Sequence, residues 1–257
     1  MGAPMARALL RSGIDTTGFD IRSGDVFDGI PMQFDPVRFA RPLSHLFTVV
    51  RDAAETDALL FGDQAVLRHA GELRFLVICS TLAPGYVQDL RARVPDHIAM
   101  IDAPMSGAAI AAERGGLTFM LGGDAADIDA LQLFLAAMGQ HFHHMGGLGA
   151  GMTTKVLNNL IAAASTAATR TALQWGHHHG LSRDHLLQVF HESSGQTWFG
   201  SGFDEIEFTK DGFAPDNSIG ILAKDVACAM DAAPPGTDFS LPEALIAVIR
   251  GLDPIED

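Results

Sequence analysis

The stretch "HFHHMGGLGAGMTTKVLNN" (141–159) divides the sequence into two parts with different residue patterns. Before it, short apolar runs of strand-forming residues alternate with helical patterns. After it, the strand signals stop and only helical periodicity continues. Four glycines between Gly146 and Gly151 mark the change, as expected for a loop between two folding units. We therefore predict two domains, residues 1–148 and 149–257.

The first part predicts an α/β domain, because alternating strands and helices form crossover units around a parallel sheet. The second part predicts an all-α domain. Strands are expected at 46–50, 75–79, 97–102 and 117–121, and helices between them at 54–62 and 85–94. Helical patterns in the second part span 152–180, 182–195 and 218–233.

The composition indicates a protein that acts on a small molecule. With 17 basic and 31 acidic residues, the formal charge is -14, which argues against binding to nucleic acid or to an anionic membrane. Cys79 and Cys228 lie in apolar stretches, so we expect two buried free thiols and a cytoplasmic location. The uncharged run 156–169 is too short and too polar to span a bilayer, and we expect a buried helix there.

The opening "MGAPMARALL" (1–10) predicts an amphipathic helix that begins almost at residue 1, with Gly13 where it stops. In a dinucleotide-binding fold, such a helix follows a G-x-G-x-x-G loop, and an acidic residue about 20 positions later binds the ribose. Gly2 fits the last glycine of that fingerprint. Asp20, 18 residues later and at the end of a short expected strand, fits the acidic residue. The alternative is a turn glycine and an aspartate in a surface turn.

Four linked motifs extend over most of the chain: "VICSTLAPG" (77–85), "DAPMSGAAIAAERGGLTFMLGGD" (102–124), "GGLGAGMTTKVLNN" (146–159) and "SIGILAKDV" (218–226). Together they resemble the β-hydroxyacid dehydrogenases, the family of 3-hydroxyisobutyrate dehydrogenase and tartronate semialdehyde reductase. The resemblance implies a Rossmann-type domain followed by an all-helical domain. Relatives begin with a strand and a Gly-x-Gly-x-Met-Gly loop and continue beyond "RGLDPIED" (250–257), so the match implies that the first strand is missing here.

Lys155 is the expected catalytic residue. Oxidising a β-hydroxyacid requires a base for the hydroxyl proton, and Lys155 starts an otherwise uncharged helix, where loss of water favours a neutral amine. Taken alone, a lysine there is more often a solvated surface charge, but the family's catalytic lysine matches this position. Imine-reducing relatives replace that lysine, so its presence favours alcohol or aldehyde chemistry. Asn159 lies one turn further on the same face, where it would hold the substrate hydroxyl or the lysine. Asn158 is expected to be a packing or capping partner.

The motif "MSGA" is expected to bind the substrate carboxylate. Ser106 offers a hydroxyl group, and Gly107 and Ala108 offer backbone N–H groups. The alternative is an ordinary tight loop after a strand. Relatives have a second glycine where Ala108 stands, so a positive φ at this position would strain or reshape the substrate pocket.

The resemblance also implies the cofactor contacts: Gly2 at the pyrophosphate, Asp20 at the adenosine ribose, Val50 and Arg51 beside the nucleotide, Thr81 near the nicotinamide, and Lys224 from the helical domain. Asp20 repels a 2′-phosphate and favours NAD, whereas Arg22 would accept that phosphate, which leaves NADP as the alternative. For Asp225 we expect an ordinary exposed ion pair with Lys224.

The histidine clusters at 141–144 and 177–179 lack metal-ligand spacing, so no metal site is expected. A hydrophobic seam along residues 152–175 predicts a homo-oligomer, either a dimer or a tetramer. Because the glycine fingerprint is incomplete, the alternative function is a non-catalytic relative that serves as an oligomeric scaffold or a binding protein.

Overall fold

The computed structural model describes residues 1–255, and the chain forms two compact units, Met1–Lys155 and Val156–Asp257. The first unit is built from a sheet with helices, and the second contains helices and loops but no strand among its described residues. The predicted fold class, an α/β part followed by an all-α part, is confirmed.

The first unit contains one sheet with the strand order β1-β2-β3-β5-β4, and β6 also pairs with β5. Its strands are β1 (His45–Thr48), β2 (Phe75–Ile78), β3 (Ala99–Asp102), β4 (Met105–Ser106), β5 (Leu117–Gly122) and β6 (Gly139–Gly146). The pairs β1–β2 and β2–β3 are parallel, as predicted, and β5–β6 is parallel as well. However, β5 runs antiparallel to β3 and β4, so the sheet is mixed. For β4 and β5 the physical reason is that a parallel crossover needs a dozen or more residues, and only residues 107–116 join these two strands.

Three strand predictions need correction. The patterns missed β4, which has two residues, and β6, whose side chains are largely exposed and therefore lack apolar alternation. The short strand expected to end at Asp20 is reduced to a single bridge between Gly18 and Met32, outside the named strands.

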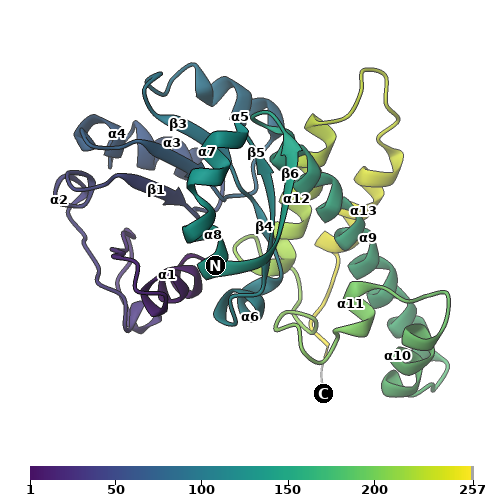
Figure 1. The fold of residues 1–257 in the computed structure, drawn as a ribbon. Coiled ribbons are helices and arrows are strands. Elements are labelled where there is room, and N and C mark those ends of the chain that lie inside the picture. Colours follow the sequence, from purple (N-terminus) through teal and green to yellow (C-terminus); the bar gives the residue numbers. More distant parts are fainter. Residues whose placement is uncertain (256–257) are drawn as a thin grey trace. The chain divides into compact units, whose positions relative to one another are not determined.

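Helices cover both faces of this sheet. They are α1 (Gly2–Arg11), α2 (Pro36–Ala40), α3 (Ala53–Leu60), α4 (Val66–His69), α5 (Pro84–Arg91), α6 (Ala108–Glu113), α7 (Ala125–Ala130) and α8 (Gln132–Met138), with a 3-10 turn at Asp25–Phe27. The opening helix is confirmed, and Gly13, at a φ of +75°, follows its end. Figure 1 shows α1 near α8, which it contacts.

Successive side chains along a strand pack into two separate hydrophobic cores, one on each face of the sheet. On β2, Leu76 and Ile78 pack with α2 to α5, whereas Val77 packs with α1 and with α6 to α8. This is the period of two expected for a strand buried on both faces. The sheet is thereby fixed between two helical layers, and the loops at its strand ends are held in place.

The second unit is formed by helices: α9 (Ala150–His178), which begins in the first unit, α10 (Arg183–Glu192), α11 (Trp198–Ser201), α12 (Ser218–Asp231) and α13 (Ser240–Arg250). Figure 1 shows α12 and α13 side by side. Buried Arg170 ties two loops together, because its guanidinium donates to the carbonyls of Thr209 (2.6 Å), Asp211 (2.9 Å) and Asp253.

Cys79 is a buried free thiol as expected, and burial raises its pKa to about 12. The expectation for Cys228 was wrong in degree, since this residue is only partly buried on α12. Within residues 1–255, no helix combines the length and the apolarity needed to cross a membrane.

Candidate active site

The loops expected to bind cofactor and substrate meet at one edge of the sheet in the first unit. Strands β1, β2 and β3 are parallel neighbours, so their carboxyl ends lie at the same edge. Val50 and Arg51 follow β1 and Thr81 follows β2, whereas Ser106 to Ala108 lie beyond β3, from the end of β4 to the start of α6. In open α/β sheets, ligands bind at this edge.

The start of α1 lies beside the loop after β1. A Cβ added to Gly2 would stand 3.5 Å from Cβ of Val49, next to Val50. The first turn of α1 contains no acidic residue, and its N-cap, Met1, makes no side-chain capping hydrogen bond. A helix terminus attracts anions such as a pyrophosphate, and the role of Gly2 at the cofactor stays a prediction.

Four charged side chains gather near this loop. Arg22 binds Asp20 through its backbone N–H (2.9 Å), its Nε (3.1 Å) and its Nη2 (3.1 Å). Arg51 folds back on Glu55, which accepts from Nη2 at 2.9 Å. Glu55 also raises the pKa of Arg22 through its charge, although the bond to Asp20 contributes more. Glu55, which the sequence did not single out, therefore pairs with Arg51 and favours the charged form of Arg22 through its own charge.

The carboxylate of Asp20 is held in its charged form. Partial burial acts to raise the pKa of Asp20, but the hydrogen bonds and the charge of Arg22 outweigh burial, so the pKa is lowered. The Arg22 side chain is 78% exposed, against 24% for Asp20. An exposed arginine thus covers the carboxylate that was predicted to bind the ribose.

The loop after β4 has the strained backbone that the sequence anticipated. Gly107 has a φ of +134° and Ala108 a φ of +57°. The left-handed region disfavours every residue with a Cβ, by roughly 1–2 kcal/mol. Ala108 therefore occupies a conformation that suits glycine, at the position where relatives were expected to have one.

Lys155 is buried in the second turn of α9, where it is 8% exposed. The first turn is attached to the same sheet edge, because Leu82 N–H donates to Sδ of Met152 at 3.3 Å, and Leu82 is adjacent to Thr81. The first unit thus brings Lys155 to the edge that carries the expected cofactor and substrate loops.

In the second unit, Asn159 is buried and its amide donates to Asp225 Oδ2 at 2.6 Å. Asn158 is exposed and donates to Asn159 Oδ1 at 3.1 Å. Lys224 Nζ lies 2.9 Å from Asp225 Oδ1. The expectation of an exposed ion pair was wrong for Asp225, which is 2% exposed. An adjacent lysine and aspartate look like a solvated pair in the sequence, whereas the packing of α12 buries one of them.

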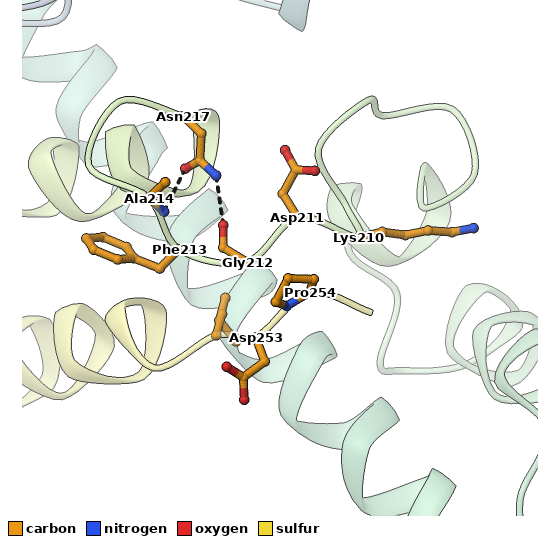
Figure 2. Close-up of a pocket in the computed structure, with 9 residues that line it drawn as sticks. Lys210, Asp211, Gly212, Phe213, Ala214, Asn217, Asp253 and Pro254 are labelled. Carbon is orange, nitrogen blue, oxygen red and sulfur yellow. Dashed lines mark hydrogen bonds between the residues drawn. The ribbon is translucent and has the colours of Figure 1, made fainter. Parts of the chain in front are cut away.

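A separate hollow of about 450 Å³ lies in the second unit (Figure 2). It is lined by Lys210, Asp211, Gly212, Phe213, Ala214, Asn217, Leu252, Asp253 and Pro254. Figure 2 shows that the Asn217 side chain is hydrogen-bonded within the chain. Its Nδ2 donates to Gly212 O at 2.7 Å, and its Oδ1 accepts from Ala214 N–H at 3.3 Å. This lining shares no residue with the expected catalytic, substrate or cofactor sets.

The histidine clusters lie on β6 and at the end of α9. Across residues 1–255, His, Cys, Asp and Glu form no group of three or more that is placed to hold a metal ion.

Comparison with known proteins identifies the family. Residues 1–147 match the NAD binding domain of 6-phosphogluconate dehydrogenase, and residues 149–252 match the NAD-binding domain of NADP-dependent 3-hydroxyisobutyrate dehydrogenase. The chain is 32% identical to the NAD-dependent L-serine dehydrogenase of Pseudomonas aeruginosa, over 77% of this chain and 68% of that protein. It is 29% identical to the L-threonate dehydrogenase of Cupriavidus necator, over 91% of this chain and 80% of that protein.

The fold is that of a solved relative as well. The crystal structure of 3-hydroxyisobutyrate dehydrogenase from Salmonella typhimurium superposes with a TM-score of 0.83 at 23% identity, covering 96% of this chain and 89% of that one. The resemblance seen in the sequence motifs is thereby confirmed, as are NAD as cofactor and NADP as a possible one. The chain belongs to the β-hydroxyacid dehydrogenases, a family of NAD(P)-dependent oxidoreductases.

Proposed function

We propose that this chain oxidises the hydroxyl group of a small β-hydroxyacid, or reduces the corresponding semialdehyde, with Lys155 as general acid and base. The observation that carries the proposal is the burial of Lys155 at the sheet edge that carries the expected cofactor and substrate loops. A buried amine next to a reacting hydroxyl accepts its proton during oxidation and returns it during reduction. Asn159, one helical turn further, holds the hydroxyl or the lysine in register.

The substrate carboxylate binds at Ser106, Gly107 and Ala108 in this proposal. Gly107 and Ala108 both have a positive φ in the turn after β4, and their backbone N–H groups are donors that an anion can approach closely. The Ser106 hydroxyl adds a third donor. The relatives' names include serine, threonate and 3-hydroxyisobutyrate, and these are small hydroxyacids that share the carboxylate.

The proposed cofactor site uses Gly2 at the pyrophosphate, Asp20 at the ribose, Val50 and Arg51 beside the nucleotide, Thr81 near the nicotinamide, Arg22 at a 2′-phosphate where NADP binds, and Lys224 from the second unit. The bound nicotinamide exchanges a hydride with the substrate carbon. The fit rests on the first turn of α1, which contains no acidic residue, and on the carboxylate of Asp20. Because Asp20 is charged, NAD is the preferred cofactor.

A titration followed by a substrate screen tests the proposal. The fluorescence of NADH and then of NADPH is measured against the 257-residue chain. Oxidation of 3-hydroxyisobutyrate, L-serine and L-threonate is then assayed with NAD⁺ and NADP⁺.

Lys155→Ala is expected to lower kcat about a hundredfold or more, whereas Lys210→Ala, at the hollow in the second unit, is expected to leave kcat unchanged. Full turnover in Lys155→Ala would contradict the role of Lys155. A folded chain that binds neither cofactor would favour the scaffold or binding protein.

We also propose that the chain forms a homo-oligomer through α9. Leu157, Ile161 and Trp175 are 50%, 70% and 68% exposed on this helix. These positions recur at spacings of four and then fourteen residues, which keeps them on one face. Size-exclusion chromatography with light scattering is expected to give a dimer or tetramer, and Ile161→Asp a smaller species. A wild-type monomer would contradict this.

We also propose the domain bounds 1–148 and 149–257 and a cytoplasmic location.

A further inference from the structure

One buried carboxylate holds the first turn of α9. Asp102, the last residue of β3, is fully buried. Its Oδ1 accepts a hydrogen bond from Gly149 N–H at 2.7 Å, and its Oδ2 accepts one from Met152 N–H at 2.5 Å. The first N–H groups of a helix have no partner within the helix, and negative charge is stabilised there. A residue distant in sequence thus caps α9 from the edge of the sheet.

Glycines make this close approach possible. A Cβ added to Gly122 on β5 would overlap Asp102 Oδ1 and lie 2.8 Å from the carbonyl of Gly147. A Cβ added to Gly151 would overlap the carbonyl of Met120 and lie 2.9 Å from Gly122 N. The glycine-rich stretch before Lys155 therefore has a specific purpose, since it lets the backbone of the helix start lie directly against the backbone of β5.

The first turn of α9 transmits its position to Lys155. Thr153 Oγ1 donates to Gly149 O, and Thr154 Oγ1 donates to Ala150 O, both at 2.9 Å. Lys155 follows within the same unbroken helix, about 4.5 Å along the axis from Met152. A shift or rotation of the first turn would therefore displace the base of the Lys155 side chain by a similar amount.

We propose that Asp102 is a positioning residue for the reaction: its two hydrogen bonds fix the first turn of α9, and so fix Lys155 at the sheet edge where the substrate and cofactor loops meet. This inference rests on the proposed role of Lys155. Asp102 acts only through the helix and makes no contact with substrate in this scheme.

The test compares Asp102→Asn with a matched control. Asparagine keeps the shape of the side chain but replaces one acceptor oxygen by an NH₂ group that faces a backbone N–H. Asp35→Asn is the control, because Asp35 Oδ1 also accepts from two backbone N–H groups, those of Val37 (2.9 Å) and Arg38 (3.2 Å), at the start of α2. We expect Asp102→Asn to lower kcat about tenfold or more, since small misplacements of a reacting group have large effects. The KM and the Kd for NADH stay within about twofold, and Asp35→Asn changes none of the three.

A double variant shows whether Asp102 acts through Lys155. If it does, Asp102→Asn/Lys155→Ala is no slower than Lys155→Ala alone, because the second change moves a side chain that is already absent. If the double variant instead lowers kcat by the product of the two single effects, the proposal is overturned. A kcat for Asp102→Asn equal to that of the wild type would overturn it as well. Activity retained in Lys155→Ala, or a wild type that turns over none of the three hydroxyacids, would instead overturn the proposed function and this inference with it.

Circular dichroism and NADH binding establish that each variant folds. If Asp102→Asn does not, Asp102→Ser, which is smaller and retains one acceptor, replaces it. Failure of both variants to fold would assign Asp102 to folding and overturn the positioning role. Hydrogen exchange of the amides at 149–152 gives a second readout: it is expected to accelerate in either folded variant and not in Asp35→Asn, and unchanged protection would overturn the proposal.

Discussion

The amide of Asn159 is oriented by the buried carboxylate of Asp225. It donates to Asp225 Oδ2 at 2.6 Å, while Asn158 donates to Asn159 Oδ1 at 3.1 Å. This arrangement fixes which end of the amide carries the oxygen. Lys224 Nζ lies 2.9 Å from the other oxygen of Asp225, so one carboxylate connects two side chains with proposed roles in the site.

Replacing Asp225 by asparagine is therefore expected to lower both stability and activity. The change removes the charge beside Lys224 and sets an NH₂ group against either the Asn159 amide or that lysine. A buried polar group left without a partner costs about 1–3 kcal/mol, so urea unfolding shows a loss of that size. Asp216→Asn, at an exposed turn of the same unit, is the control. An Asp225→Asn variant as stable and active as the wild type would show that the amide needs no such partner.

Cofactor choice is expected to depend on the ion pair between Arg22 and Asp20. Arg22→Ala removes the cation proposed for the 2′-phosphate, so the Kd for NADPH rises about fivefold or more, as for a lost charge-assisted bond. The Kd for NADH is unchanged or falls, because Asp20 is freed. Arg38→Ala removes an equally exposed arginine, 78% exposed and paired with Asp35, and is expected to change neither. An equal loss of NADH and NADPH affinity in Arg22→Ala would rule out a selective role.

Ala108→Gly is expected to stabilise the chain by about 1 kcal/mol, since glycine adopts a positive φ without the Cβ clash. Ala65→Gly makes the same change at a φ of +43° at the N-cap of α4, away from the proposed substrate loop. Both variants are expected to raise the midpoint of urea unfolding, but only Ala108→Gly changes KM for the hydroxyacid. A change of KM in both variants, or in neither, would show that Ala108 has no specific role in substrate binding.

Stability is expected to fall as pH rises from about 4 to 6 because of Asp102. Burial raises the pKa of Asp102 to about 6, against the opposing hydrogen bonds of Gly149 and Met152, from an ordinary value of 3.8. The folded chain then binds this proton more tightly than the unfolded chain does, so the contribution is present at low pH and is lost as pH passes the folded pKa. At about 1.4 kcal/mol per pKa unit, the group accounts for about 3 kcal/mol.

Urea unfolding at pH 4 and pH 7 checks this contribution. The wild type is compared with Asp102→Asn, in which the group cannot titrate. The change in the free energy of unfolding between the two pH values is measured for each, and the difference between these changes gives the contribution of Asp102. Asp35→Asn is again the control, since Asp35 is an exposed capping residue. Parallel pH profiles for the wild type and Asp102→Asn would contradict the raised pKa.

The sequence was sufficient for the features that rest on periodicity and on short motifs. Short apolar runs of strand-forming residues located β1, β2, β3 and β5, and helical spacing located α9, α10 and α12. The concern about Ala108 was also sound, because the motif placed it where a glycine is usual, and its φ is positive.

The features that the sequence did not predict depend on contacts between distant segments. Asp102 looks like the end of a strand, and its two partners lie 47 and 50 residues later. Glu55 looks like a first-turn helix residue until Arg51 folds onto it. Asp225 is buried by the packing of α12 with its neighbours. Local patterns contain no information about such pairings, which arise only when the chain has folded.

The helix α9 runs from Ala150 to His178, and the division between the two compact units falls inside it, between Lys155 and Val156. At this point there is no loop for a protease to cut or for an engineer to lengthen. Inserting or deleting a single residue would turn everything that follows by about 100° around the helix axis. A chimera that joins the first half of this protein to the second half of a relative must therefore be spliced in helical phase, with the number of residues between Lys155 and Asn159 kept.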